Sequence, residues 1–153
     1  MEEGKLSKKD IKIVIAAHKP YRMPEDTMYV PLHVGAEGKK NPDGTPPDLG
    51  YQKDNEGDNI SAKNPYYCEL TGIYYAWKNI PAEYLGLVHY RRYFKGKNKS
   101  KDPFACIVTE PEMEKIFETH RIVVPKKRKY YIETLYSHYA HTCLLYTSPS
   151  PRD

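Results

Sequence analysis

Two short apolar runs constrain the fold of this 153-residue chain more than any other feature. The first is Ile11–Ala17, IKIVIAA, and the second is Tyr84–His89, YLGLVH. Both are nearly continuous in apolar residues, and the first is rich in β-branched side chains, which is typical of strands buried on both faces. Strands of that kind belong to parallel sheets that other elements cover on each side. The two runs therefore predict two central strands of a sheet.

The segment from Asn64 to Asn79 is the clearest amphipathic helix in the sequence. Asn64 suits the N-cap and Pro65 suits the first helical position, where its missing N–H costs nothing. Apolar residues then recur at helical spacing, at Tyr66, Leu70, Ile73, Tyr74 and Trp77. We expect one helix that ends near Pro81, with this stripe and its Trp77 in the core.

Further elements are predicted around these. The pattern Thr109-x-x-Glu112 is a capping box that opens a second helix, whose apolar stripe is Met113, Ile116, Phe117 and His120. Short strands are expected at residues 28–34, 105–108 and 122–125, and a last helix carries Ile132, Leu135, Tyr136 and Tyr139. Because strands and helices alternate, the chain is predicted to form an α/β domain.

The final stretch, residues 143–153, reads CLLYTSPSPRD. Each residue is what a sequencing-library adapter would encode in this frame, so we expect a non-native tail, although a disordered Ser/Pro-rich terminus is the alternative. We therefore divide the chain into a polar extension at residues 1–10, a partial domain at 11–142 and the tail. The domain is expected to be incomplete at its C-terminus and this chain to be inactive.

Composition narrows the setting without naming a ligand. The formal net charge of +4 suits phosphates, an anionic membrane face or nucleic acid equally. No apolar run approaches the roughly 20 residues that span a bilayer, and outside the tail only Cys68 and Cys106 remain, so we expect a cytoplasmic protein. The 15 tyrosines suit half-wet cleft walls where sugars or nucleotides lie, or simply the edge of the core.

The run HYRRYF, at residues 89–94, follows the second apolar strand and is the sharpest candidate site. Two guanidinium forks flanked by aromatic rings suit a diphosphate-linked ligand, and in α/β sheets ligands bind outside the carboxyl ends of strands. The alternative is a pair of arginines tied to acidic neighbours. His18 and Lys19 follow the first strand and are expected at the same edge.

Other patterns are weaker. Residues 54–59 resemble a calcium loop, but Asn59 and Pro65 stand where an EF-hand needs glycine and glutamate, so we reject that reading. His138 and His141 imitate a zinc site only together with Cys143 of the tail. The basic residues 125–129 fit a nuclear signal or a solvated strand exit. No Asp-x-Asp metal motif follows the second strand.

Four segments in order resemble a bacterial family: IVIAAHKPY, DNISAKNPYYCELTGIYYAWKN, YLGLVHYRRYF and IVVPKKRKYYIETLYSHYAHT. The chain is similar to the domain of unknown function 4422 family, whose members are encoded among capsular and exopolysaccharide biosynthesis genes. The resemblance implies a glycosyltransferase with a Rossmann-like, nucleotide-sugar-binding (GT-A-like) sheet flanked by helices. It implies a nucleotide-sugar donor and a lipid-linked oligosaccharide or polysaccharide acceptor, at the inner face of the cell membrane.

We carry this onto the sequence as a hypothesis. The substrate-binding residues would be His18, Lys19, Asn59, Asn64, His89, Tyr90, Arg91 and Arg92. Arg91 and Arg92 would hold the diphosphate by fixed charge, and Asp58 or Glu69 would be the catalytic base. No metal ligand is assigned, and a divalent cation, Mg²⁺ or Mn²⁺, is left open as cofactor. A non-catalytic sugar-binding or assembly module is the alternative, and a nucleic-acid binder is the weaker one.

Overall fold

The structure is a computed structural model that describes residues 9–127, 131, 134 and 136–137. The chain divides into two compact units, Met1–Ile122 and Val123–Asp153. The elements below belong to the first unit. Most of the predicted last helix lies outside the described residues, among them Ile132, Leu135 and Tyr139. His138, His141 and the tail at residues 143–153 lie outside them as well.

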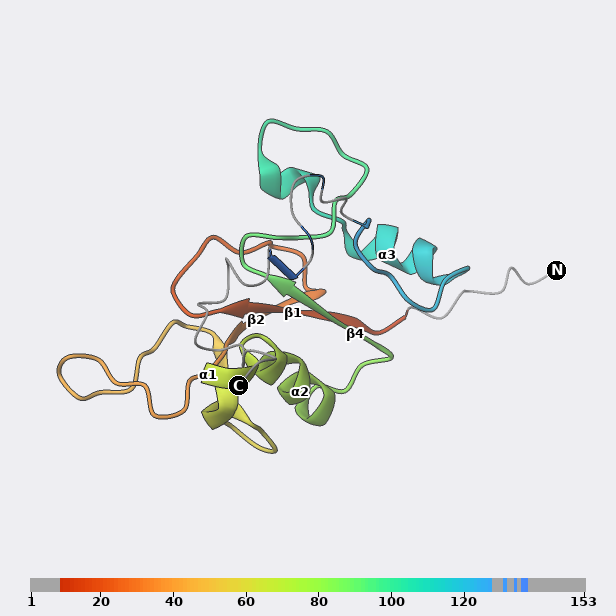
Figure 1. Cartoon of the computed structure of the whole chain (residues 1–153). Coiled ribbons are helices and arrows are strands. Elements are labelled where there is room, and N and C mark those ends of the chain that lie inside the picture. Colours follow the sequence, from red (N-terminus) through yellow and green to blue (C-terminus); the bar gives the residue numbers. More distant parts are fainter. Residues whose placement is uncertain (1–8, 128–130, 132–133, 135, 138–153) are drawn as a thin grey trace. The chain divides into compact units, whose positions relative to one another are not determined.

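The first unit is built on a parallel sheet (Figure 1). Its strands are β1 (Ile11–Ala17), β2 (Tyr29–His33), β3 (Gln52–Lys53) and β4 (Tyr84–His89), in the order β3-β2-β1-β4. Ile13 pairs with Tyr29 on one side and with Gly86 on the other, and every pairing is parallel. Both apolar runs thus form strands with the predicted bounds, and β2 confirms the strand predicted at residues 28–34.

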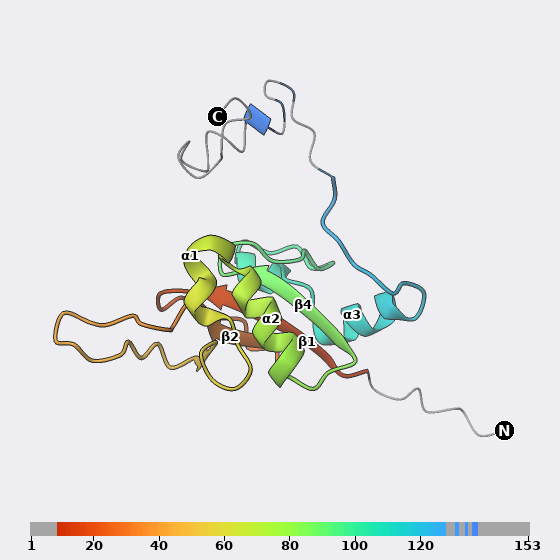
Figure 2. The same ribbon diagram turned by 60° about the horizontal axis from the view of Figure 1, so that its bottom comes forward.

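The sheet is covered on both faces, as its continuous apolar strands require. Val14 and Ala16 of β1 face a core cluster with Leu32 and with Tyr75 and Ala76 of helix α2 (Leu70–Asn79). On the opposite face, the Tyr84 ring stacks on Phe117 of helix α3 (Glu110–Phe117), with ring centroids 3.9 Å apart. Figure 1 shows α2 and α3 on opposite sides of the strands, and Figure 2 shows α1 and α2 lying over them.

The single helix predicted from Asn64 to Asn79 is wrong. A short helix α1 (Asn64–Tyr67) ends at Cys68, whose φ of 48° and ψ of −129° break the helix before α2 begins. The break has a physical cause, because the Asn64 side chain donates to the Cys68 carbonyl at 2.8 Å and to Thr71 Oγ1 at 3.0 Å. Asn64 is therefore the first helical residue of α1, and Lys63 takes the N-cap position.

The predicted inward stripe is wrong at Tyr66, Leu70 and Trp77, whereas Ile73 packs against the core cluster. Tyr66, Leu70 and Trp77 are 87%, 56% and 63% exposed, so Trp77 is not a core residue. Helix α2 instead buries Thr71, Gly72, Tyr75 and Ala76. Gly72 lets the helix approach the sheet so closely that a Cβ there would lie 2.9 Å from Val34. Close approach at Gly72 therefore decided which face is buried, and Trp77 faces away.

Two predicted short strands do not form. Asp102 accepts a hydrogen bond from the Phe104 N–H and starts a 3-10 turn, η2 (Pro103–Cys106), where residues 105–108 were expected to be extended. Ile122 and Val124 are 77% and 72% exposed, and residues 122–125 have no strand hydrogen bonds in the described part of the chain. The capping box is confirmed, since the Glu112 carboxylate accepts from the Thr109 N–H at 3.0 Å.

A buried carboxylate fixes the loops at the carboxyl end of the sheet. Asp54 is fully buried and accepts from the N–H groups of Gly35 and Ala36 at 2.8 and 3.0 Å. The hydroxyls of Ser61 and Thr71 donate to the same carboxylate, at 2.5 and 2.8 Å. Since a buried charge is tolerated only when it is hydrogen-bonded, these four donors hold the loop after β2, the turn η1 (Ser61–Lys63) and α2 together.

Candidate functional site

The strand order places a ligand edge between β1 and β4. In β3-β2-β1-β4 the chain runs outward from β1 in one direction and then returns to pair β4 on its other side. Ligands of doubly wound sheets bind at such a reversal, outside the carboxyl ends of the strands. Here that edge is formed by His18, directly after β1, and by His89, the last residue of β4.

Side chains from three parts of the chain meet there and form what we call the strand-exit cluster. Its members are His18, Tyr21, Glu69, His89, Tyr90 and Arg91. Tyr21 stacks on Tyr90 with ring centroids 3.7 Å apart, and His18 meets the same ring edge-on at 5.3 Å. The Arg91 guanidinium lies 4.9 Å from the Tyr90 centroid. Tyr90 is buried, so its ring supports the groups around it.

A carboxylate and an imidazole are paired inside the cluster. Glu69 Oε1 lies 3.8 Å from His89 Nε2, and the two side chains are 47% and 27% exposed. Glu69 directly follows the strained Cys68 and precedes α2, so the break in the helix directs this carboxylate toward β4. The Arg91 N–H donates to His89 Nδ1 at 3.3 Å and holds the other side of the ring.

Both histidines of the cluster favour the neutral form. Burial lowers the pKa of His18, and the charges of Lys19, Lys39 and Arg91 act in the same direction, opposed by Glu69. Burial also lowers the pKa of His89, with Glu69 opposing the shift and the two arginines adding to it. At neutral pH these imidazoles therefore donate and accept hydrogen bonds without adding charge.

The fixed positive charge comes from exposed side chains beside the cluster. Lys19, Arg91 and Arg92 are all exposed and follow the ends of β1 and β4. Arg92 closes a tight turn, because its N–H donates to the His89 carbonyl at 2.8 Å. The structure thus brings together six of the ten predicted site residues with Glu69, namely His18, Lys19, His89, Tyr90, Arg91 and Arg92.

The other three predicted residues lie elsewhere. Asp58 accepts from the Tyr74 hydroxyl at 3.1 Å and lies beside Asn79, at the end of α2 far from Glu69. Asn59 accepts from the Ser61 N–H at 3.1 Å in a local turn. Asn64 is occupied by the helix break described above. Asp58 therefore lies along the second half of α2, whereas Glu69 lies just before its first residue.

Two residues near this edge were not predicted. Tyr21 was not assigned to the site, and its position three residues after His18 was the only signal that its ring would meet the imidazole. His33, the last residue of β2, is 1% exposed, and its Nδ1 has no hydrogen-bond partner among the described residues. Burial lowers the pKa of His33 as well.

The donor set does not match a metal site. The described residues contain no group of three His, Cys, Asp or Glu side chains arranged to hold a metal ion. The strand-exit cluster offers one carboxylate and two imidazoles among several cations, so we assign no step to a divalent ion. Within the described part, no helix has the length and apolar content needed to cross a bilayer.

Comparison with known proteins supports this reading of the fold. A solved structure described as the apo form of the bifunctional glycosyltransferase WbbM is 40% identical and superimposes with a TM-score of 0.51. The match covers 61% of this chain and 16% of WbbM, so the chain spans a small part of that protein. The predicted α/β, GT-A-like sheet with flanking helices is confirmed.

The family resemblance is confirmed by a match to the family's sequence pattern. Curated proteins gave no match. Residues 12–148 match the domain of unknown function 4422, which covers most of the chain. The chain therefore belongs to the DUF4422 family.

Proposed function

We propose that this chain carries the donor-binding part of a glycosyltransferase and that a nucleotide diphosphate sugar binds at the strand-exit cluster. The observation that carries the proposal is the meeting of Arg91, Lys19 and the Glu69–His89 pair at the carboxyl edge between β1 and β4. The likeness to WbbM, whose description names a glycosyltransferase, supports it.

The positively charged side chains of the site would stabilise the leaving nucleotide. As the glycosidic bond to the donor breaks, negative charge develops on the diphosphate, and groups already aimed at it lower the barrier. The Arg91 guanidinium is held over Tyr90 by a cation–π contact, so it is positioned before the ligand arrives. The turn that ends at Arg92 keeps the backbone of this residue beside His89. The neutral His18 and His89 suit sugar or ribose hydroxyls.

Glu69 fits the catalytic base better than Asp58. The acceptor hydroxyl must lose its proton to a carboxylate within hydrogen-bond reach. Glu69 lies in the cluster beside His89, whereas Asp58 is bound to Tyr74 and lies 3.9 Å from Lys78 at the other end of α2. We therefore propose Glu69 as the base and His89 as the group that orients it.

The proposed acceptor and the proposed location in the cell rest on the family resemblance. The product would extend a lipid-linked oligosaccharide or a surface polysaccharide from the cytoplasmic side of the membrane. The family description itself names no activity.

The donor site is tested by nucleotide binding. Calorimetric titration of UDP, GDP and ADP into the chain should give one site whose affinity falls at least tenfold in the Arg91→Ala/Arg92→Ala variant, because two charge-assisted contacts are lost. The matched control is Lys97→Ala/Lys99→Ala, which removes the same charge from the neighbouring exposed loop. Equal affinities in both variants would show that the diphosphate does not bind at the strand exit.

A second assay separates the classes of function. A longer family member is incubated with nucleotide sugars, and release of the nucleoside diphosphate is followed. Release is expected of a transferase, whereas a sugar-binding module would bind the donor without releasing it. A nucleic-acid binder would instead show oligonucleotide affinity that falls steeply with salt.

A further inference from the structure

A cavity of about 260 Å³ lies apart from the strand-exit cluster, between the loop that follows β1 and the segment around η2. Its walls are residues 22–26 from the first loop, the Tyr29 ring, and residues around Phe104 and Val108. The Tyr29 hydroxyl donates to the Val108 carbonyl at 2.9 Å and fixes the floor against the sheet. Arg22 directly follows Tyr21, so this cavity adjoins the cluster along the chain.

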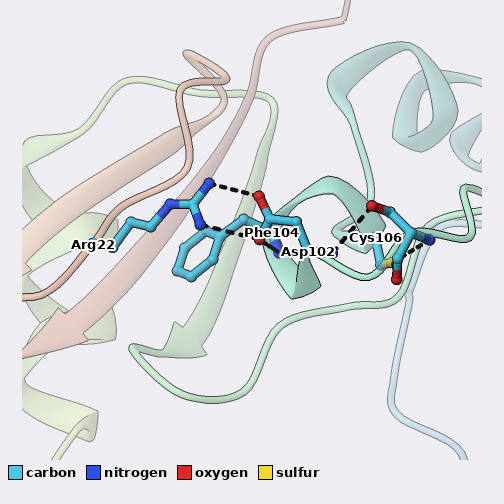
Figure 3. Close-up of polar contacts among 5 residues, drawn as sticks. Arg22, Asp102, Phe104 and Cys106 are labelled. Carbon is cyan, nitrogen blue, oxygen red and sulfur yellow. Dashed lines mark hydrogen bonds and ion pairs between the residues drawn. The ribbon is translucent and has the colours of Figure 1, made fainter.

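An ion pair joins the two walls. Both terminal nitrogens of Arg22 donate to Asp102, at 3.0 and 2.7 Å, and the guanidinium lies 4.4 Å from the Phe104 ring centroid (Figure 3). Asp102 also accepts from the Phe104 N–H. The two bonds leave three N–H groups of Arg22 and lone pairs of Asp102 for a ligand, next to an aromatic ring. Vicinal hydroxyls of a pyranose need such paired donors and acceptors.

The charge of the cavity is opposite to that of the strand exit. Glu25, Asp26 and Asp102 line it against one cation, Arg22. The Arg22 guanidinium holds the pKa of Asp102 below its usual range, so this carboxylate stays ionised. Asp26 is fixed in place, because it accepts from the backbone N–H groups of Met28 and Glu110 at 2.9 and 2.8 Å. A surplus of fixed carboxylates repels phosphates and uronic acids.

The size also limits the ligand. The volume of the cavity is about 260 Å³. Pockets for drug-sized ligands begin near 300 Å³, which makes this one small for a nucleotide. A single sugar ring fits.

From charge, size and the Arg22–Asp102 fork we infer that this cavity, which we call the acidic cavity, binds one uncharged pyranose ring and serves as the acceptor sugar subsite. The subsite role rests on the proposed transferase function. The binding of an uncharged sugar does not, because it follows from the cavity alone.

The test is saturation-transfer NMR on the full chain with a panel of methyl pyranosides. The neutral probes are the methyl glycosides of galactose, mannose and N-acetylglucosamine, and the anionic probe is that of galacturonic acid. At least one neutral probe should give transfer, and the galacturonide should give at least fivefold less. Arg22→Gln and Asp102→Asn should each weaken the neutral probe about tenfold. Asn keeps the cap on Phe104, so the turn survives.

To show that the two sites are separate, each site's variant is tested against the ligand of the other site. The Arg91→Ala/Arg92→Ala variant should leave pyranoside binding within twofold, and Arg22→Gln should leave UDP binding within twofold. Absence of transfer to every pyranoside, equal transfer to the galacturonide, or full binding by Arg22→Gln and Asp102→Asn would each overturn the inference. If the unaltered chain binds a neutral pyranoside but not UDP, the proposed function is contradicted and this inference stands.

Discussion

The strand-exit cluster and the acidic cavity differ in charge and in construction. The cluster stands on the ends of β1 and β4 and is flanked by Lys19, Arg91 and Arg92. The acidic cavity is enclosed by two loops that meet through Arg22 and Asp102. In the proposed function, the positive charge of the cluster attracts the donor diphosphate, whereas the acidic cavity repels it and leaves room for an uncharged acceptor sugar. The difference teaches that the two regions favour ligands of different charge.

The largest expected effect concerns the base. In a longer family member, Glu69→Gln at the equivalent position should lower turnover about 10²- to 10⁴-fold, since a positioned general base contributes that much. Binding of the donor nucleotide should change little. Asp58→Asn is the matched control and should retain most turnover, because Asp58 lies at the far end of α2. The reverse ranking of the two variants would place the reaction away from the strand exit.

The next effect concerns the support beneath the cluster. Asp54→Asn should lower the free energy of unfolding by about 2–4 kcal/mol, since an amide cannot accept all four hydrogen bonds that Asp54 receives and leaves buried donors unpaired. Denaturant titration measures this. Asp48→Asn, in an exposed loop, is the control and should cost under about 0.5 kcal/mol. A small change at Asp54 would mean that the strand exit is not held by this carboxylate.

Acid should weaken the two regions in separate pH windows. His33 and His89 have lowered pKa values when folded, so the unfolded chain binds protons first and stability falls as the pH drops below about 6.5. Asp102 also has a lowered pKa, so its contribution is complete above about pH 4 and is lost below it. Melting temperature against pH should show both slopes. His33→Leu should flatten the first and Asp102→Asn the second, and an unchanged profile in either variant would refute that assignment.

The smallest effect concerns the Arg22–Asp102 pair itself. The Arg22 and Asp102 side chains are 64% and 40% exposed, and exposed ion pairs contribute little to stability. Arg22→Gln should therefore leave the free energy of unfolding in denaturant titration nearly unchanged while weakening sugar binding. A larger loss of stability would mean that the pair holds the loops together and that its role in recognition is secondary. Glu25→Gln is the control, because it removes one charge from the same wall and leaves the Arg22–Asp102 pair intact.

The sequence allowed the strand exit to be predicted because its signals are local. Continuous apolar residues gave β1 and β4 their bounds, and HYRRYF lies next to β4 in the chain. The acidic cavity has no local signal, since Arg22 and Asp102 are 80 positions apart. The buried face of α2 was predicted wrongly because hydrophobic spacing favoured Trp77, whereas close contact at Gly72 decided the packing. Glu69 and Asp58 could not be separated, since only the folded chain shows which lies beside His89.

The backbone at Cys68 has a consequence for how this domain can be altered. A residue with a side chain in that conformation costs about 1–3 kcal/mol, and glycine would adopt it without strain. The chain thus gives up stability to turn the peptide just before Glu69. Variants selected only for heat resistance should accumulate glycine at position 68, and a glycine there would also let the following carboxylate sample more directions. At position 68, higher thermal stability and a fixed orientation of the Glu69 carboxylate therefore favour different residues.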